Sequence, residues 1–231
     1  MDLLVDGFRQ AFGLLASGNA EIRAVLWLSL LVSSTATLVA LLIGVPAGVA
    51  LALGRFPGRR LLISAVNAGM GLPPVVVGLF VSILLWRSGP LGVLEILYTP
   101  VAMVVAQAVI ASPIVTGITL AAVQNVPEAF RLQLVALGAS RAQMVWVVLR
   151  EARLPMLAAV MAGFGAVISE IGASLMVGGN IKGHTRTLTT AMVLETSKGN
   201  FDAAIALAVL LLVLIFLVNW GLTVVQQRRA P

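Results

Sequence analysis

The sequence contains no cysteine and a single histidine, His184. The lack of cysteine excludes disulfide bonds, thiolate zinc sites, iron–sulfur clusters and thiol catalysis, and one histidine excludes any metal motif built on two. Charged residues are also scarce, at 10% of 231 residues against roughly 25% in soluble domains. Because 60% of the residues are hydrophobic, a soluble fold of this size would expose too much apolar surface to water. An ordinary cytosolic enzyme and a disordered chain are therefore both excluded.

The formal net charge of +6 would suit a nucleic-acid-binding protein, but its distribution does not. The 15 lysines and arginines stand in short clusters between apolar runs, which is how membrane proteins carry charge. We therefore expect a lipid bilayer, and no nucleic acid, around this chain.

Long apolar stretches predict membrane-spanning helices. About 20 apolar residues cross a bilayer core, and a backbone in lipid must bond internally, which favours helices over strands. We expect an all-α membrane protein whose transmembrane domain covers residues 24–227 and crosses the membrane five times. The spans should lie at about residues 26–52, 61–86, 98–123, 155–178 and 203–225.

Residues 1–23 precede the first span. They hold three acids and no continuous apolar run, so no cleavable signal peptide is evident. Apolar residues recur there at helical spacing, which fits a short helix lying in the membrane interface. A frayed amphipathic terminus is the alternative.

The basic residues predict the orientation. Between the expected spans, nine lysines and arginines fall on one side and six on the other. Because the side richer in bases faces the cytoplasm, we expect the N-terminus outside and the C-terminus inside. The nine are Arg55, Arg59, Arg60, Arg131, Arg141, Arg150, Arg153, Arg228 and Arg229.

The cytoplasmic loop of about residues 124–153 is larger than the others and has an amphipathic, helical pattern. A loop of this kind without a domain of its own suggests docking to a partner. A surface helix that packs beneath the bundle is the alternative.

This loop carries Gly138 followed by Ala139-Ser140-Arg141, and Leu154-Pro155 closes the pattern. Here the sequence resembles the inner-membrane permease subunits of binding-protein-dependent ABC importers. The family's Glu, six residues before the Gly, is replaced by Leu132. Leu132 cannot make the polar contact of that Glu, whereas the resemblance retains the bend at the glycine and the helix geometry.

Further stretches are similar to the tungstate-type permeases, and the resemblance runs over about residues 25–225. Molybdate- and sulfate-type permeases share the pattern at Glu170–Gly172. The resemblance implies import of an oxyanion, tungstate first, with molybdate or sulfate as alternatives. The stretches are Leu72–Gly78, Arg87–Gly92, Ile168–Ala173, Val177–Ile181 and Thr185–Ala191.

The resemblance also implies an assembly in the cytoplasmic (inner) membrane of a prokaryote. Two copies of this chain, with the fold of type I ABC importer permeases, would form a homodimer. Two separate ATPase subunits would bind ATP and Mg²⁺, and an extracytoplasmic binding protein would deliver the oxyanion. This chain would hold no cofactor, and an ATPase would dock on a coupling helix near Leu132–Arg141. The coupling residues so implied are Leu132, Ala136, Leu137, Gly138, Ala139, Ser140, Arg141 and Pro155.

The second span is interrupted near its middle by Pro73 and Pro74. Proline donates no hydrogen bond and clashes with the preceding turn, so a half-helix should begin at Pro74. Its first N–H groups, around Val75, would be free at the positive end of the helix. Broken helices in transporters aim such ends at anionic substrates. An ordinary proline kink is the alternative.

Glu170 is the only ionisable residue deep in a span. A charge there costs roughly 2.5–3.5 kcal/mol, so we expect it to have a role. A carboxylate does not attract an anion, so Glu170, with the neighbouring Ser169, fits a gate or the interior of the bundle. Its partners would be hydroxyls or a base such as Arg186, and a purely structural hydrogen bond is the alternative.

The third span contains Ser112 and Thr116 on either side of Pro113. These hydroxyls are weak candidates for the translocation path, because hydroxyls in spans usually bond their own backbone.

The outer loop of residues 179–202 carries Lys182, Thr185 and Arg186. Bases and hydroxyls together suit the guidance of an oxyanion or contact with the binding protein. A solvated loop is the alternative.

Three other functions fit less well. Gly178–Thr185 nearly matches a phosphate-binding loop, but His184 replaces its lysine, so we exclude nucleotide binding. An intramembrane enzyme would need a histidine within a span or several clustered carboxylates. An autonomous secondary transporter usually has more than five spans and an internal repeat.

Overall fold

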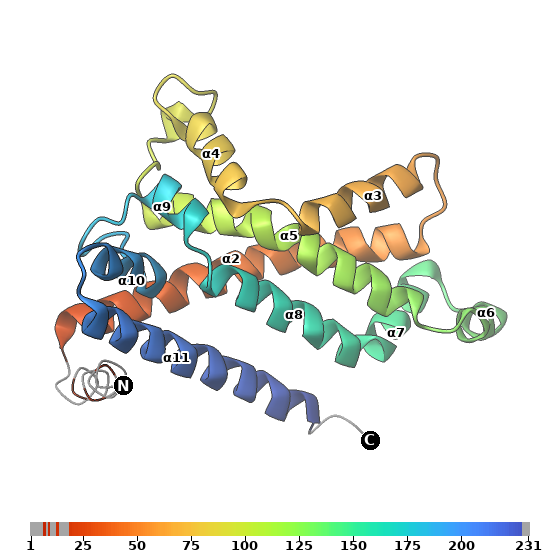
Figure 1. Cartoon of the computed structure of the whole chain (residues 1–231). Helices are drawn as coiled ribbons and strands as arrows, with labels where there is room; N and C mark the ends of the chain where they lie inside the picture. The colour runs from red at the N-terminus through yellow and green to blue at the C-terminus, as the bar shows by residue number, and fades with distance from the viewer. Residues whose placement is uncertain (1–6, 8, 10–12, 14–18, 228–231) are drawn as a thin grey trace.

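The computed structural model describes residues 7, 9, 13 and 19–227, and that part of the chain is helical without a strand (Figure 1). The all-α prediction is confirmed. The interfacial helix predicted for residues 1–23 falls mostly outside the described residues. The helices are α2 (Ala20–Leu53), α3 (Arg59–Met70), α4 (Pro74–Leu85), α5 (Pro100–Gln124), α6 (Glu128–Ala136), α7 (Arg141–Glu151), α8 (Arg153–Ile168), α9 (Gly172–Gly178), α10 (Leu188–Ser197) and α11 (Phe201–Gln227), with a short 3₁₀ helix at Gly92–Leu94.

Three helices, α2, α5 and α11, are long and apolar enough to cross a membrane by themselves. Two bent pairs add one candidate span each: α3 with α4, at an angle of 102°, and α7 with α8, at 70°. The described residues therefore contain three to five candidate spans, which makes the chain a multi-pass membrane protein.

The break expected in the second span is present. α3 ends at Met70 and α4 begins at Pro74, with Pro73 in extended conformation before it. The two prolines explain the break because neither can donate a backbone hydrogen bond to continue α3.

The expected fourth span, residues 155–178, is not one helix. α8 ends at Ile168 and α9 begins at Gly172, so the continuous helix that we predicted there is wrong. The carboxylate of Glu170 accepts a hydrogen bond from the N–H of Ala173 at 2.9 Å. A side chain that satisfies the first N–H groups of a new helix favours a break over continuation.

The centre of the molecule is the pair α2 and α5, with α8 packed against both (Figure 1). A Cβ atom on Gly44 of α2 would lie 2.8 Å from the side chain of Val115, and one on Gly48 would lie 2.7 Å from the carbonyl oxygen of Thr116. These two glycines let the helix backbones approach closely, as small residues do in membrane bundles.

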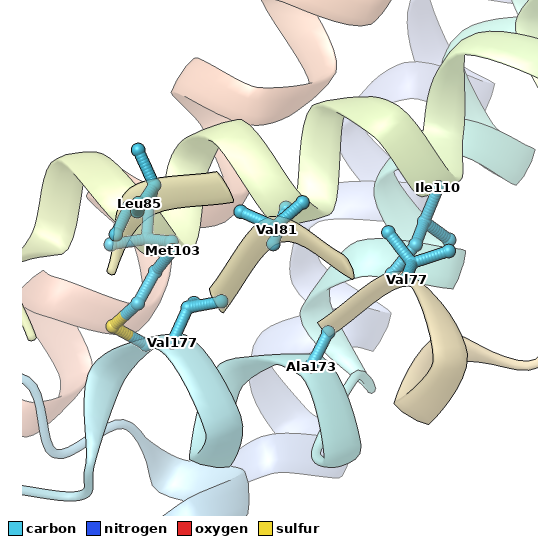
Figure 2. Close-up of a cluster of buried hydrophobic side chains, with 10 residues drawn as sticks. Val77, Val81, Leu85, Met103, Ile110, Ala173 and Val177 are labelled. Atoms are coloured by element: carbon cyan, nitrogen blue, oxygen red, sulfur yellow. The ribbon is translucent and has the colours of Figure 1, made fainter. Parts of the chain in front are cut away.

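α4 packs between α5 and α9, as Figure 2 shows. Its tight contact with α9 depends on Gly78, where a Cβ atom would come 2.7 Å from the Cα of Ala173. The first half of α4 is thereby fixed beside the start of α9. The labelled side chains of this cluster are Val77, Val81, Leu85, Met103, Ile110, Ala173 and Val177.

Candidate functional site

The two helix breaks meet at one place. We call this place the break junction and define it as residues Pro73–Val75 and Ser169–Gly172. A Cβ atom on Gly172 would lie 2.6 Å from the side chain of Val75, so the first turn of α4 lies directly against the start of α9. The structure thus brings together five residues that the sequence proposed for the path or gate. They are Pro73, Pro74, Val75, Ser169 and Glu170.

The positive end of α4 is less open than the sequence predicted. The N–H groups of Val76 and Val77 both donate to the carbonyl oxygen of Pro73, at 2.9 and 3.3 Å. Among the described hydrogen bonds, none has the N–H of Val75 as donor, and Val75 is exposed. Of the first N–H groups of α4, that of Val75 is therefore available to a ligand, and those of Val76 and Val77 are not.

Glu170 is 8% exposed and lies inside the bundle, as expected. Its carboxylate accepts from the N–H of Ala173, and its carbonyl oxygen accepts from the hydroxyl of Thr189 at 3.1 Å. The base that we considered as its partner, Arg186, instead donates to the side-chain and backbone oxygens of Asn180, at 3.2 and 3.3 Å. Glu170 therefore ties α8, α9 and α10 together through backbone and hydroxyl groups.

A buried threonine cluster supports the break junction from α10, and the sequence alone did not single out its members. The hydroxyl of Thr187 lies 3.0 Å from that of Thr189 and 3.2 Å from that of Thr190. Thr187 and Thr190 also cap the start of α10 reciprocally. The signal in the sequence is Thr187 followed by Thr190 before an apolar run, which is the spacing of a helix cap.

A second buried polar pair was missed. The amide nitrogen of Gln107 on α5 donates to the hydroxyl of Ser174 on α9 at 3.1 Å, and both side chains are buried. Gln107 is the single amide between residues 98 and 123. That isolation was the available signal, because a lone amide in a span needs a partner.

Ser112 and Thr116 do not lie at the break junction. Their hydroxyls donate to the carbonyl oxygens four residues earlier, of Ala108 and Ser112, at 2.6 and 2.7 Å. Both residues line a groove of about 640 Å³ between α2, α3 and α5. Their satisfied hydroxyls and their place in this groove distinguish them from the other path candidates.

The outer loop separates into exposed and buried residues. Lys182 forms an ion pair with Glu21 at the start of α2, at 2.9 Å, and stays exposed. Thr185 is fully buried: its hydroxyl accepts from the N–H of Ile181 and donates to the carbonyl oxygen of Gly178. The side chain of Thr185 thus holds the loop together from inside and is not exposed for the partner contact that the sequence suggested.

The turn between α10 and α11 carries Glu195. Its carboxylate accepts from the amide of Asn200 at 2.8 Å and from the ammonium of Lys198 at 2.7 Å. These two bonds favour the ionised form and hold the pKa of Glu195 below its usual range. The ionised carboxylate thereby fixes the end of α10 beside the start of α11.

The large loop of residues 124–153 folds into α6, a sharp turn and α7. The N–H of Gly138 donates to the carbonyl oxygen of Val135, and the N–H of Ala139 donates to that of Leu134. This pattern ends a helix with a left-handed residue, and Gly138 has φ of +79°. Ser140 then caps α7 in a reciprocal pair with Gln143.

These two caps correct the expected coupling helix. It does not cover Leu132–Arg141 as one element, because α6 ends at Ala136 and Arg141 already begins α7. Pro155 lies in the first turn of α8, where proline is tolerated.

α6 and its turn present an apolar surface to solvent. Leu132 is 63% exposed, Val135 58% and Leu137 84%. We call these three residues the docking ridge. Three large aliphatic side chains on one short helix and its turn form the kind of patch that a partner protein covers.

The sequence is similar to a family of known proteins and to several individual permeases. The family described as "Binding-protein-dependent transport system inner membrane component" matches residues 44–231. The tungstate uptake system permease protein TupB of Peptoclostridium acidaminophilum is 38% identical over 95% of this chain and 96% of its own length. A probable anion ABC transporter permease protein of Haloferax volcanii is 42% identical, over 83% of this chain and 84% of its own. Permeases named for molybdenum and sulfate transport are more distant.

The fold is also found among solved structures. A chain of the inward-facing MetNI methionine ABC transporter superposes with a TM-score of 0.75 and 21% identity. The match covers 91% of this chain and 97% of that one.

Proposed function

Because this chain belongs to the family of binding-protein-dependent transport system inner membrane components, and is thus a permease subunit of an ABC importer without an ATPase site of its own, we propose that it carries tungstate into the cell. The observation that supports tungstate is the 38% identity, over nearly the whole chain, to a permease of a tungstate uptake system. The relative named as a probable anion permease supports the same class of substrate.

The assembly that we propose has two copies of this chain in the cytoplasmic membrane. Two ATPase subunits bind ATP and Mg²⁺ on the inner face, and a binding protein delivers the oxyanion from outside. The N-terminus lies outside and the C-terminus inside, as the distribution of bases indicates. Hydrolysis in the ATPase pair drives the two permeases between inward-open and outward-open forms.

The docking ridge is the contact that we propose for the ATPase. It lies on α6, which begins directly after the long helix α5, and a Gly138 turn and a capped α7 follow it. Leu132, in the place of the family's Glu, makes this contact apolar. A pull on α6 is passed to α5 through the short segment of residues 125–127 that joins them.

The break junction is the part of the path that we propose for the oxyanion. The free N–H of Val75 stands at the positive end of α4, which favours an anion by position and by charge. Glu170 is turned into the bundle, where it bonds to backbone, so it holds the junction in shape and does not bind the substrate. Of Lys182, Thr185 and Arg186, Lys182 is the exposed one, and its exposure supports a contact with the binding protein.

Uptake measurements test the substrate. The test uses cells that lack their own tungstate importer and that express this chain together with the ATPase and the binding protein of the proposed assembly. These cells should accumulate labelled tungstate. Molybdate and sulfate in equal amounts should compete weakly. Preferential uptake of sulfate or molybdate would show that tungstate is not the main substrate. Uptake without the ATPase would contradict the proposal that the chain works as part of an ABC importer.

A further inference from the structure

A basic cavity on the α6 side of the molecule has no part in the proposed function. It encloses about 630 Å³ between the α2–α3 turn and the α5–α6 connection. Four of its lining residues are arginines, and Glu128 is the one acid among them. The arginines are Arg55, Arg59, Arg60 and Arg131.

The charges in this cavity are poorly compensated by the protein itself. Glu128 approaches Arg55 only to 3.8 Å, and both side chains are largely exposed. Arg59 donates to the carbonyl oxygen of Leu51 at 2.6 Å, and Arg131 to that of Val126 at 3.2 Å, which satisfies hydrogen bonds but neutralises no charge.

The start of α3 adds to this excess of positive charge. α3 has Gly58 as its N-cap, no side-chain cap, and no acid in its first turn. Its first two residues are instead Arg59 and Arg60. Bases at the positive end of a helix are unfavourable, whereas an anion there is favourable. An anionic group seated among the guanidinium groups would reverse this unfavourable arrangement.

An apolar groove adjoins the cavity. This is the groove of about 640 Å³ between α2, α3 and α5, and Phe56 lines both spaces. Its other walls are mostly alanine, valine and leucine side chains, and the Ser112 and Thr116 hydroxyls in it are already bonded to their own helix. The charged cavity and the apolar groove therefore meet at Phe56, and the groove suits a hydrocarbon chain.

We propose that these two spaces form a binding site for an anionic phospholipid. The phosphate lies among Arg55, Arg59, Arg60 and Arg131, and an acyl chain lies along the groove past Phe56. A free oxyanion would use the arginines alone, and the adjoining groove is what favours a lipid. Basic pockets between helices on the cytoplasmic side have this chemistry. Because Arg131 belongs to α6, a bound lipid would connect the α2–α3 turn to the helix that carries the docking ridge.

Native mass spectrometry of the full chain in detergent tests the site. With phosphatidylglycerol and phosphatidylcholine offered together, the protein should retain phosphatidylglycerol. The double substitution Arg55→Gln/Arg60→Gln should weaken that retention by about 10- to 30-fold. The matched control Arg150→Gln/Arg153→Gln removes the same charge from exposed arginines outside the cavity and should leave retention unchanged.

A second variant tests the groove. Ala65→Phe fills it without altering charge and should also reduce phosphatidylglycerol binding. Equal retention of both lipids, or equal loss in the control, would overturn the site. Binding of added inorganic phosphate or tungstate that depends on Arg55 and Arg60 but not on Ala65 would identify a free oxyanion site and overturn the lipid. A dimer that dissociates on Ala65→Phe, with lipid binding unchanged, would assign the groove to a second copy of the chain.

Discussion

Glu170 illustrates how one side chain organises this protein at the scale of the residue. A buried carboxylate in a span is costly, yet here it accepts from the N–H of Ala173, where α9 starts. Its own carbonyl group accepts from Thr189 on α10. The same residue thus ends one helix, begins another and holds a third, which explains why a charge is tolerated at this depth.

Substitution of Glu170 separates the hydrogen bond from the charge. Glu170→Gln keeps a side-chain oxygen for the N–H of Ala173, so we expect normal expression and a melting temperature near that of the natural protein. Glu170→Ala leaves that donor without a partner, which costs about 1–3 kcal/mol, and should lower the melting temperature by several degrees. Thermal denaturation of the purified chain measures both. Equal losses in the two variants would show that the charge itself is required.

Gly138 is the second residue with a defined requirement. Its φ of +79° is strained for other residues, and no heavy atom lies within 4 Å of an added Cβ. Gly138→Val should therefore fold but shift the turn after α6, at a cost of roughly 1–2 kcal/mol. We expect less copurified ATPase and lower uptake. Gly165→Ala is the control, because it lies in α8 with equally open space and no positive φ. If Gly138→Val copurifies as much ATPase as the natural chain, the turn at Gly138 is not required for docking.

At the scale of the element, the broken pair of α3 and α4 is the most consequential feature. The 102° bend sets α4 against α9 and leaves the N–H of Val75 free. A continuous helix over the same residues would have neither the contact at Gly172 nor an exposed positive end. Both properties depend on the proline pair.

Removal of the prolines tests the break. Pro73→Ala/Pro74→Ala restores two N–H donors and permits the helix to continue, so we expect intact assembly and a loss of uptake of about tenfold or more. Pro46→Ala is the control, because Pro46 lies inside the unbroken helix α2. Transport assays with a blue-native gel report activity and assembly separately. Full uptake by the double variant in an intact assembly would remove the break from the mechanism.

Much of this element structure follows from local sequence. Apolar runs predict α2, α5 and α11, and the proline pair predicts the end of α3. The bend at Gly138 was expected only from the family resemblance, and the end of α6 at Ala136 was not predicted. The break at Ser169–Ile171 was not predicted: Glu170 could have formed a cap locally, but its carbonyl group also bonds to Thr189 and Gly172 packs against Val75, and both partners are distant in the sequence. The internal bonds of Thr185 and the location of Ser112 and Thr116 were not predicted either. A residue type indicates capacity for a bond, but tertiary packing selects the partner.

At the scale of the whole molecule, the orientation in the membrane governs every partner assignment. The docking ridge serves a cytoplasmic ATPase only if α6 faces inward, and Lys182 meets an external binding protein only if its loop faces outward. The natural absence of cysteine makes this directly testable.

Single cysteines provide the measurement. Arg141→Cys should react with a membrane-impermeant maleimide only after the cells are opened, and Lys182→Cys should react in intact cells. The cysteine-free natural chain is the blank. The reverse pattern of labelling would show that the predicted orientation is wrong and that a cytoplasmic ATPase cannot bind to α6.

The first long helix, α2, has a consequence of its own. Its 34 residues extend ~51 Å at 1.5 Å per residue, well beyond the ~30 Å of a hydrocarbon core. Glu21 near one end is held by Lys182, and Leu51 near the other is held by Arg59. In the topology that we propose, these two contacts lie on opposite faces of the bilayer, so a tilt of α2 would displace both of them together.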